Sequence, residues 1–295
     1  MRASQLQTPP PDVAKARTRA ARAADGSMAL GEHLKELRYR IIVSALGVLA
    51  GAIVAFVFRH DILNFITKPY CHLPQAKVLT TTNGSCTLVI SGVLDAFTLS
   101  LKISINVGII ATAPIWLWQL WRFVTPGLRS KERKYVLSFV TASTLLFAAG
   151  AAVAYITLPK GLQFLLGIAG HTFTPLIQAD KYISFLLAMI LIFGLAFEFP
   201  LLVVMLNVVG VASAKKLQSI RRPVIFGVFV FAAVATPSQD PYTMTALAIP
   251  MCILYEVAIL IARVHDKRVN ANSSEPDYEK LDDEQASTIP SPAGI

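Results

Sequence analysis

Six long apolar runs divide the chain, and no other feature limits its possible folds as strongly. A helix of about 20 apolar residues crosses the roughly 30 Å hydrocarbon core of a bilayer. Hydrophobic residues make up 54% of the sequence and charged residues only 15%, which is unlike a soluble domain. The sequence therefore predicts an all-α integral membrane protein with six transmembrane helices, centred on Ile41–Phe58, Ile103–Trp121, Val136–Leu158, Ile183–Val209, Pro223–Ala235 and Tyr242–Ala262.

Basic residues concentrate in alternate loops. Of the 27 Lys and Arg residues, 8 precede the first run, 5 separate the second and third, 4 separate the fourth and fifth, and 4 follow the sixth. The remaining basic residues are Arg59, Lys68, Lys77, Lys102, Lys160 and Lys181. Because basic loops stay in the cytoplasm, both termini are predicted to be cytoplasmic. The net charge of +9 then suits anionic lipid headgroups, and it does not require a nucleic-acid partner.

The polar ends of the chain frame one membrane domain. Residues 1–27 have no apolar periodicity and no secretory signal peptide, so they are predicted to be a disordered cytoplasmic extension. The domain itself is expected at residues 28–266, and residues 267–295 form a second disordered cytoplasmic tail. The fifth run is short: its 13 residues would reach only about 20 Å, so we expect the bilayer to thin or water to enter nearby.

Two cysteines share the long first outer loop. Cys71 and Cys86 lie on the predicted outer side, where an oxidising compartment favours a disulfide. Metal binding by these cysteines with His72 is the alternative, and it is weaker because no further ligand cluster accompanies them. Cys252, in the sixth run, is expected to be a small buried hydrophobe. No metal or cofactor site is predicted.

The segment before the first run has the pattern of an amphipathic helix at the cytoplasmic interface. Its Glu32 and Glu36 are four residues apart and share one face. One interpretation is a solvated face with a Glu36–Arg40 pair, which the pattern alone favours. The other is an acidic site for a cationic ligand within a basic surface. The helical spacing is set by four apolar residues, Leu30, Leu34, Leu37 and Ile41.

Glu198 is the only charged residue of the fourth run. A lone carboxylate near the middle of a bilayer is costly, and by default it implies function. We expect it to be neutral, hydrated or hydrogen-bonded, for instance to a polar neighbour such as Asn207. Pro200 follows closely and should kink the helix. Glu256 is a similar acid nearer the cytoplasmic end of the sixth run.

Two acids lie in loops. Glu132 is the single acid among four nearby bases after the Pro126-Gly127 break, and it either complements a helix dipole or supplies a second carboxylate for the same cationic ligand. Asp240 occupies the outer turn 236–241, where a cap or turn role is expected. No Ser/His/Asp, Cys/His, zinc or phosphate-loop pattern occurs in the sequence, so the protein is not expected to be an enzyme.

Four motifs together resemble TatC, the polytopic receptor subunit of the twin-arginine protein translocase. The resemblance covers about Leu30 to Val264, and the outer-loop cysteines make it similar to actinobacterial members. The motifs are His33–Arg40 (H-L-x-E-L-R-x-R), Gln119–Leu128 with Glu132-Arg133 (Q-x-W-x-F-x-x-P-x-L…E-R), Phe197–Pro200 (F-E-x-P), and Thr236-Pro237 with Asp240 and Leu247–Pro250 (T-P…D…L-A-x-P).

The resemblance implies a concave, glove-like six-helix fold with a cytoplasmic groove that binds signal peptides carrying paired arginines. It assigns the arginine contacts to Glu36 and Glu132, and it places Glu32, Arg38 and Phe123 at the same site. Implied partners are single-span TatA- and TatB-type subunits, further copies of the chain, and folded substrates with twin-arginine signals. Export would be driven by the proton-motive force across the bacterial cytoplasmic membrane.

Two other functions remain to be distinguished. A proton- or ion-coupled secondary transporter would use Glu198 at mid-membrane and would gather its polar groups there. A membrane scaffold would bind no ligand at all. The receptor interpretation instead requires its acids at the cytoplasmic rim.

Overall fold

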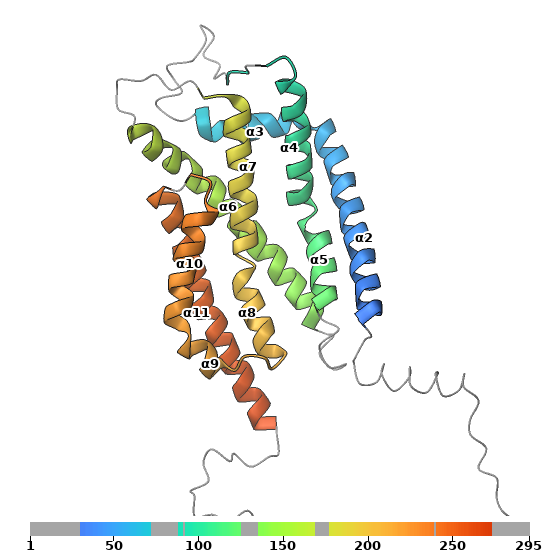
Figure 1. Ribbon diagram of the computed structural model, residues 1–295, viewed down its shortest axis with the longest axis vertical. Helices are drawn as coiled ribbons and strands as arrows, with labels where there is room; N and C mark the ends of the chain where they lie inside the picture. The colour runs from blue at the N-terminus through green and yellow to red at the C-terminus, as the bar shows by residue number, and fades with distance from the viewer. Residues whose placement is uncertain are drawn as a thin grey trace, which may run out of the picture.

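The chain folds into an elongated bundle of helices that lie side by side (Figure 1). The computed structural model describes residues 30–71, 88–90, 92–124, 135–168, 177–238 and 240–272. Within these ranges the only β pairing is an isolated bridge between Val89 and Gln178. The helices are α2 (Leu30–Val57), α3 (Arg59–Cys71), α4 (Asp95–Ala111), α5 (Ala113–Val124), α6 (Tyr135–Ile168), α7 (Ala179–Ala196), α8 (Phe199–Val208), α9 (Ala214–Ser219), α10 (Arg221–Ala235) and α11 (Pro241–Asn272).

Six passes run along the bundle, as the apolar pattern predicts. The helix α2, the helix α6, the pair α7–α8 and the helix α11 are each long and apolar enough to cross a membrane. The bent pair α4–α5 supplies a fifth pass. The sixth is α10, whose 15 residues reach only about 22 Å, so the fifth apolar run is short in the fold as well. The start of α2 and the end of α11 lie at the same end of the bundle, the lower end in Figure 1.

The bend between α4 and α5, by 55°, was not predicted. Pro114 has no N–H for the carbonyl four residues before it, so the helical ladder is interrupted there. Thr112 donates from its hydroxyl to the Gly108 carbonyl at 2.7 Å and closes the end of α4. The indole N–H of Trp116 donates to the Ile109 carbonyl at 2.9 Å. A side chain thus satisfies a backbone acceptor that the bend exposes.

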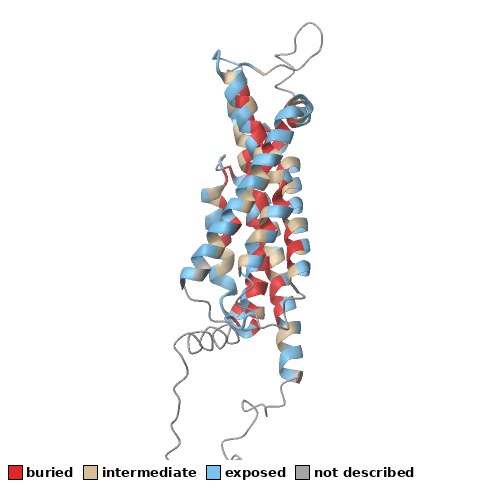
Figure 2. Cartoon of the chain, turned by 90° about the vertical axis from the view of Figure 1, so that its right-hand side faces the viewer, coloured by how far each residue is buried: buried red, intermediate tan, exposed pale blue. Residues whose placement is uncertain are grey.

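The pair α7–α8 is the central element of the bundle. In the most apolar 18-residue stretch of this pass 61% of the residues are buried, against 11% in α2. The pass is interrupted at Phe197 and Glu198, just before Pro200, as the sequence predicts. Buried residues follow the inner faces of the helices and exposed ones the outer faces (Figure 2). The outer faces carry many exposed Leu, Ile, Val and Phe side chains, which suits contact with lipid.

Close helix packing depends on glycine at two crossings. A Cβ on Gly108 of α4 would lie 2.6 Å from the backbone nitrogen of Ala52 on α2. A Cβ on Gly150 of α6 would lie 2.5 Å from the carbonyl oxygen of Phe193 on α7. Both distances are too short for any side chain, so these passes approach at backbone contact, as small residues allow in membranes.

Three features of the fold differ from the sequence interpretation. The helix α3 lies across the upper end, within the predicted first outer loop, and its Ile66 and Tyr70 are buried one turn apart. The helix α6 continues to Ile168, ten residues beyond Leu158, where the third apolar run ends. The helix α11 reaches Asn272, beyond the domain boundary expected at residue 266.

Candidate functional site

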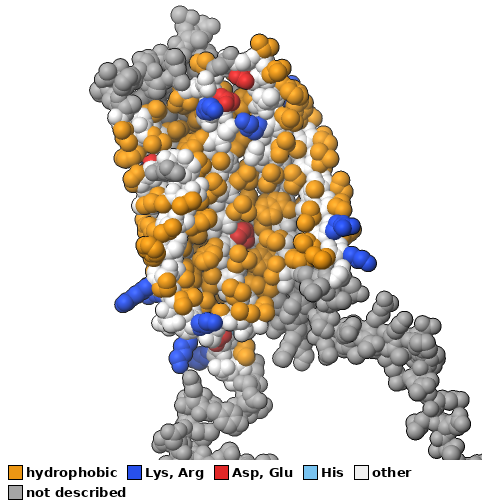
Figure 3. Space-filling view, in the orientation of Figure 1, with side chains coloured by type: hydrophobic (Ala, Val, Ile, Leu, Met, Phe, Trp, Pro, Cys, Tyr) orange, Lys and Arg blue, Asp and Glu red, His pale blue; other side chains and the backbone are white. Residues whose placement is uncertain are grey.

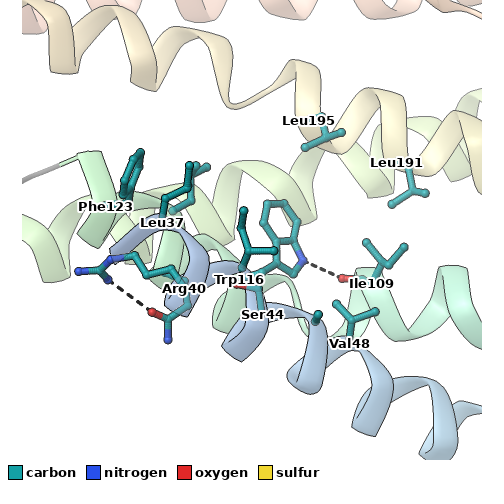
Figure 4. Close-up of a pocket in the computed structure, with 13 residues that line it drawn as sticks. Leu37, Arg40, Ser44, Val48, Ile109, Trp116, Phe123, Leu191 and Leu195 are labelled. Carbon is teal, nitrogen blue, oxygen red and sulfur yellow. Dashed lines mark hydrogen bonds between the residues drawn. The ribbon is translucent and has the colours of Figure 1, made fainter. Parts of the chain in front are cut away.

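An open groove lies between α2, α5 and α7 in the lower half of the bundle. It encloses about 490 Å³ and is lined almost wholly by apolar side chains. Its polar lining consists of Arg40, Ser44, Trp116 and Gln119. Figure 4 shows Leu37, Phe123 and Trp116 lying along the groove, with Arg40 at one end. The remaining walls are Ile41, Ala45, Val48, Ile109, Leu120, Leu191 and Leu195.

A charged cluster forms the end of this groove nearest the start of α2. Arg40 is only 8% exposed, yet it carries a full positive charge. Its Nε donates to Glu36 Oε1 at 3.2 Å, and its Nη2 also contacts Oε1. Its Nη1 donates to Gln119 Oε1 on α5 at 3.4 Å, which joins the two helices (Figure 4). The pairing of Glu36 with Arg40, one of the two sequence interpretations, is therefore present in the fold.

The other residues assigned to a peptide site by resemblance divide into three groups. Phe123 is half-buried and lines the groove, whereas Arg38 is exposed on α2. The backbone of Glu32 lies in α2, but its side chain is outside the described part of the structure. Glu132 also lies outside the described residues, between the end of α5 and the start of α6.

Glu198 belongs to a buried hydrogen-bonded network in the middle of the bundle. Its side chain is 6% exposed, and its Oε2 accepts a hydrogen bond from Ser143 Oγ at 2.6 Å. Ser143 in turn accepts from the indole N–H of Trp121 at 2.9 Å, and both of these residues are fully buried. The network joins α5, α6 and the α7–α8 break. Among the described residues, Oε1 of Glu198 has no hydrogen-bond partner.

The expected contact between Glu198 and Asn207 is wrong. Asn207 lies about two and a half turns further along the same pass, too far for its side chain to reach. Its Nδ2 donates instead to Asp266 Oδ1 at 2.8 Å and to the Ala212 carbonyl at 2.9 Å. The other carboxylate oxygen of Asp266 accepts from the Ala214 amide at 2.7 Å. Asp266 thereby ties α11 to the start of α9, a role that nothing in its local sequence indicates.

Glu256 lies in an ion pair rather than alone in the bilayer. Its Oε1 is 2.5 Å from Nε of Arg221, the first residue of α10, and both side chains are partly exposed. This pair joins α10 to α11 at the lower part of the bundle. The sequence interpretation named the acid but not its partner, because the two residues are distant in the chain.

Asp240 is the helix cap that its turn predicts. The side chain is 3% exposed; its Oδ1 accepts from the Thr243 amide at 2.8 Å and its Oδ2 from the Thr243 hydroxyl at 2.5 Å. These bonds satisfy donors at the start of α11. Gly161 of α6 packs against the same turn, since a Cβ there would lie 2.6 Å from Thr243.

The cysteines follow the expected division. Cys71, at the end of α3, is disulfide-bonded, whereas Cys252 is free and half-buried in α11. Cys86, the predicted partner of Cys71, lies outside the described residues. In the described ranges, no three His, Cys, Asp or Glu side chains gather in a metal-binding arrangement.

Comparisons with known sequences agree with the motifs. A family model described as Sec-independent protein translocase protein (TatC) matches residues 32–250. A Frankia casuarinae protein named Sec-independent protein translocase protein TatC is 46% identical over 288 residues, which cover 96% of this chain and 79% of that protein. A protein of the same name from Aquifex aeolicus is 37% identical over 246 residues, covering 82% of this chain and 97% of the relative.

Comparison with solved structures gives the same result for the fold. A crystal structure described as the twin arginine translocase receptor TatC in DDM superposes with a TM-score of 0.65 at 36% sequence identity. The match covers 78% of this chain and 99% of that one. A second crystal structure of the receptor gives a TM-score of 0.64 at 35% identity.

Proposed function

This chain belongs to the TatC family of Sec-independent protein translocase proteins, and from that premise we propose that the groove between α2 and α5 receives a twin-arginine signal peptide. As a member of the family, the chain is a signal-peptide receptor and core scaffold of the translocase, a multi-pass membrane protein that works with other subunits. The proposal concerns which residues of this chain bind the peptide.

The position of Glu36 carries the proposal. Its carboxylate pairs with Arg40, which lines one end of an apolar groove, and its side chain is 25% exposed. Signal peptides combine a positively charged segment with an apolar one. The groove offers matching chemistry over a short distance, with an acid for the charged segment and a hydrophobic wall for the apolar segment. Guanidinium suits such an acid, because its planar fork matches the geometry of a carboxylate.

We propose that Glu132 supplies the second carboxylate. In the sequence it lies eight residues after the end of α5, the helix that lines the groove beside Arg40 through Gln119 and Phe123. Two separated acids would each take one arginine of the pair. Phe123 would contact the peptide from the groove wall, while Glu32 and Arg38 would act from the exposed face of α2.

The cellular setting is proposed on the same grounds. The basic lower end of the bundle would face the cytoplasm, with both termini there, in the bacterial cytoplasmic membrane. Figure 3 shows Lys and Arg side chains near both ends of the view and a mostly hydrophobic surface between them. Single-span TatA- and TatB-type subunits and further copies of the chain would pack against its exposed apolar faces. Transport would use the proton-motive force, with no enzymatic step in this chain.

A transporter function centred on Glu198 is not favoured. A coupling site must exchange an ion or proton with water on both sides. Glu198 is buried against Ser143 and Trp121, and its hydrogen bonds join three passes of the bundle. This arrangement suits a structural role better than an exchange site.

Two substitutions test the receptor site. Glu36→Ala and Glu132→Ala should each weaken binding of a labelled Arg-Arg signal peptide by roughly 1.5–3 kcal/mol, the value typical of hydrogen bonds to charged groups. Affinity is measured on the full chain in nanodiscs. The matched control is Asp61→Ala, which removes an exposed acid from α3 at the opposite end and should leave affinity unchanged. Wild-type affinity in both glutamate variants would refute the proposal.

A further inference from the structure

The carboxylate of Glu36 already holds a guanidinium. Arg40 places both Nε and Nη2 on the single oxygen Oε1. The second oxygen, Oε2, takes no part in these two contacts. An arriving arginine therefore meets a carboxylate that is half occupied and largely neutralised. Recognition of a peptide cation at Glu36 therefore also involves the guanidinium of Arg40.

We propose that Arg40 determines the specificity of the site, because a peptide cation must replace its guanidinium on Glu36. The inference rests on the function proposed above and adds a mechanism for the choice of arginine. An arriving guanidinium can reproduce both contacts that Arg40 makes with the carboxylate, so the exchange conserves charge-assisted hydrogen bonds. A lysine ammonium is a compact point charge without the planar fork, and its exchange loses part of that interaction. Arginine is thus favoured over lysine at the moment of exchange.

Gln119 makes the exchange feasible. Arg40 is 8% exposed, and a buried cation left without acceptors would be strongly disfavoured. The amide oxygen of Gln119, 3.4 Å from Nη1, is a second acceptor on a different helix. A small movement toward α5 keeps Arg40 hydrogen-bonded while Glu36 turns to the peptide. Figure 4 shows this contact at the end of the groove, next to Leu37 and Phe123.

The neighbouring charges do not supply the same discrimination. Lys35 and Arg38 are exposed on α2, and Arg122 is exposed near the end of α5. These cations repel lysine and arginine peptides alike, because repulsion between exposed charges depends on charge and distance rather than on the shape of the group. Arg40 differs, because in the described structure it is the cation whose hydrogen bonds end on the Glu36 carboxylate.

The test compares peptide selectivity rather than affinity alone. Signal peptides carrying Arg-Arg or Lys-Lys are titrated against the full chain in nanodiscs, and the ratio of the two dissociation constants is recorded. Arg40→Gln should reduce the preference for Arg-Arg by about fivefold to tenfold, mainly by tightening Lys-Lys binding. The lysine ammonium then no longer competes with the Arg40 guanidinium for the Glu36 carboxylate. Arg40→Lys retains the charge without the fork and should reduce the preference by a smaller factor. Lys35→Gln makes the same change of charge on an exposed position of α2 and should leave the ratio unchanged.

Each outcome decides between the two proposals. If Arg40→Gln and Arg40→Lys both leave the ratio at its wild-type value, Arg40 serves only the packing of α2 on α5 and the exchange is refuted. The same holds if Lys35→Gln lowers the ratio as much as Arg40→Gln does. Glu36→Gln in the wild-type background separates the exchange from the proposed function. If it changes neither the Arg-Arg nor the Lys-Lys affinity, Glu36 does not bind the peptide, and the proposed function itself is refuted.

Discussion

Two carboxylates, Glu36 and Glu198, are held in opposite ways within one bundle. Glu36 has a side chain that is 25% exposed, and it pairs with Arg40, which lines a groove. Glu198 lies in the middle of the bundle with 6% exposure, and it accepts a hydrogen bond from the hydroxyl of Ser143. That hydroxyl accepts in turn from the indole N–H of Trp121. The difference shows that burial decides what kind of partner an acid has. A partly hydrated carboxylate can exchange one cation for another, whereas a buried one needs fixed neutral donors.

This contrast reverses the first impression given by the sequence. Glu198 stands out in an uncharged run, and Glu36 looks like an ordinary helical ion-pair member. In the fold, Glu198 belongs to a network that joins three passes, whereas Glu36 pairs with an arginine that lines a groove. The free-energy cost of placing a carboxylate in the membrane identifies a residue that matters. It does not tell whether that residue serves ligand binding or the stability of the fold.

The largest effect that would sharpen the comparison is expected at Glu198. Glu198→Ala leaves the Ser143 hydroxyl without its acceptor and opens a cavity, which should cost roughly 2–4 kcal/mol of stability. Glu198→Gln retains an acceptor oxygen and the side-chain volume, so it should cost less than about 1 kcal/mol. The measurement is the apparent midpoint of thermal unfolding in detergent micelles.

The control for this prediction lies in peptide binding. Any Glu198→Ala protein that remains folded should bind an Arg-Arg peptide with wild-type affinity, because the network does not line the groove. A variant with unchanged thermal stability and impaired peptide binding would break the comparison, since it would make Glu198 part of the receptor site.

A smaller effect is expected at Asp240, a buried acid whose partners lie in its own turn. Asp240→Ala removes the cap of α11 and its two bonds from Thr243. The loss should be about 1 kcal/mol, within the range for helix caps. Asp240→Asn can still accept from the Thr243 amide and should recover most of it, as measured by thermal unfolding. Equal losses in both variants would show that the negative charge itself, rather than the cap, is what the turn requires.

The smallest effect is the response to salt. Raising ionic strength from about 0.05 to 0.5 M shortens the Debye length severalfold, so peptide affinity at the partly exposed Glu36 should fall by about threefold. The thermal midpoint of the protein should change little through the Glu198 network, because hydrogen bonds from neutral donors at a buried site are little screened by salt. Peptide binding that is insensitive to salt would indicate that the charge of Glu36 does not attract the peptide through a solvent-exposed ion pair.

The sequence predicted much of the fold because lipid imposes a simple rule. Apolar length and basic loops were enough for six passes, and Pro200 for the break in the fourth. The bend at Thr112 was not predicted, because Pro114 lies inside an apolar run. Trp116, whose indole stabilises the bend, has the sequence pattern of an ordinary buried aromatic residue. The helix α3 was missed, since its apolar stripe is short.

The site was predicted less completely than the fold. Pattern alone gave the Glu36–Arg40 pair, which is local, but not Gln119, whose contact with Arg40 spans two passes. The same reason explains why Ser143 and Asp266 were not identified as partners. Their contacts join residues 55 and 59 positions apart, which no helical periodicity encodes.

The central claim is that recognition occurs at the groove and not at the mid-bundle acid, and photo-crosslinking tests it directly. A photoreactive residue is placed at Leu120 or Phe123, in the groove, and at Phe97, an exposed residue near the upper end of α4. With an Arg-Arg signal peptide, crosslinks are expected from both groove positions, should disappear in Glu36→Ala, and should persist in Glu198→Gln. Crosslinks from Phe97 alone, or crosslinks at the groove that ignore Glu36 and vanish with Glu198→Gln, would contradict the account.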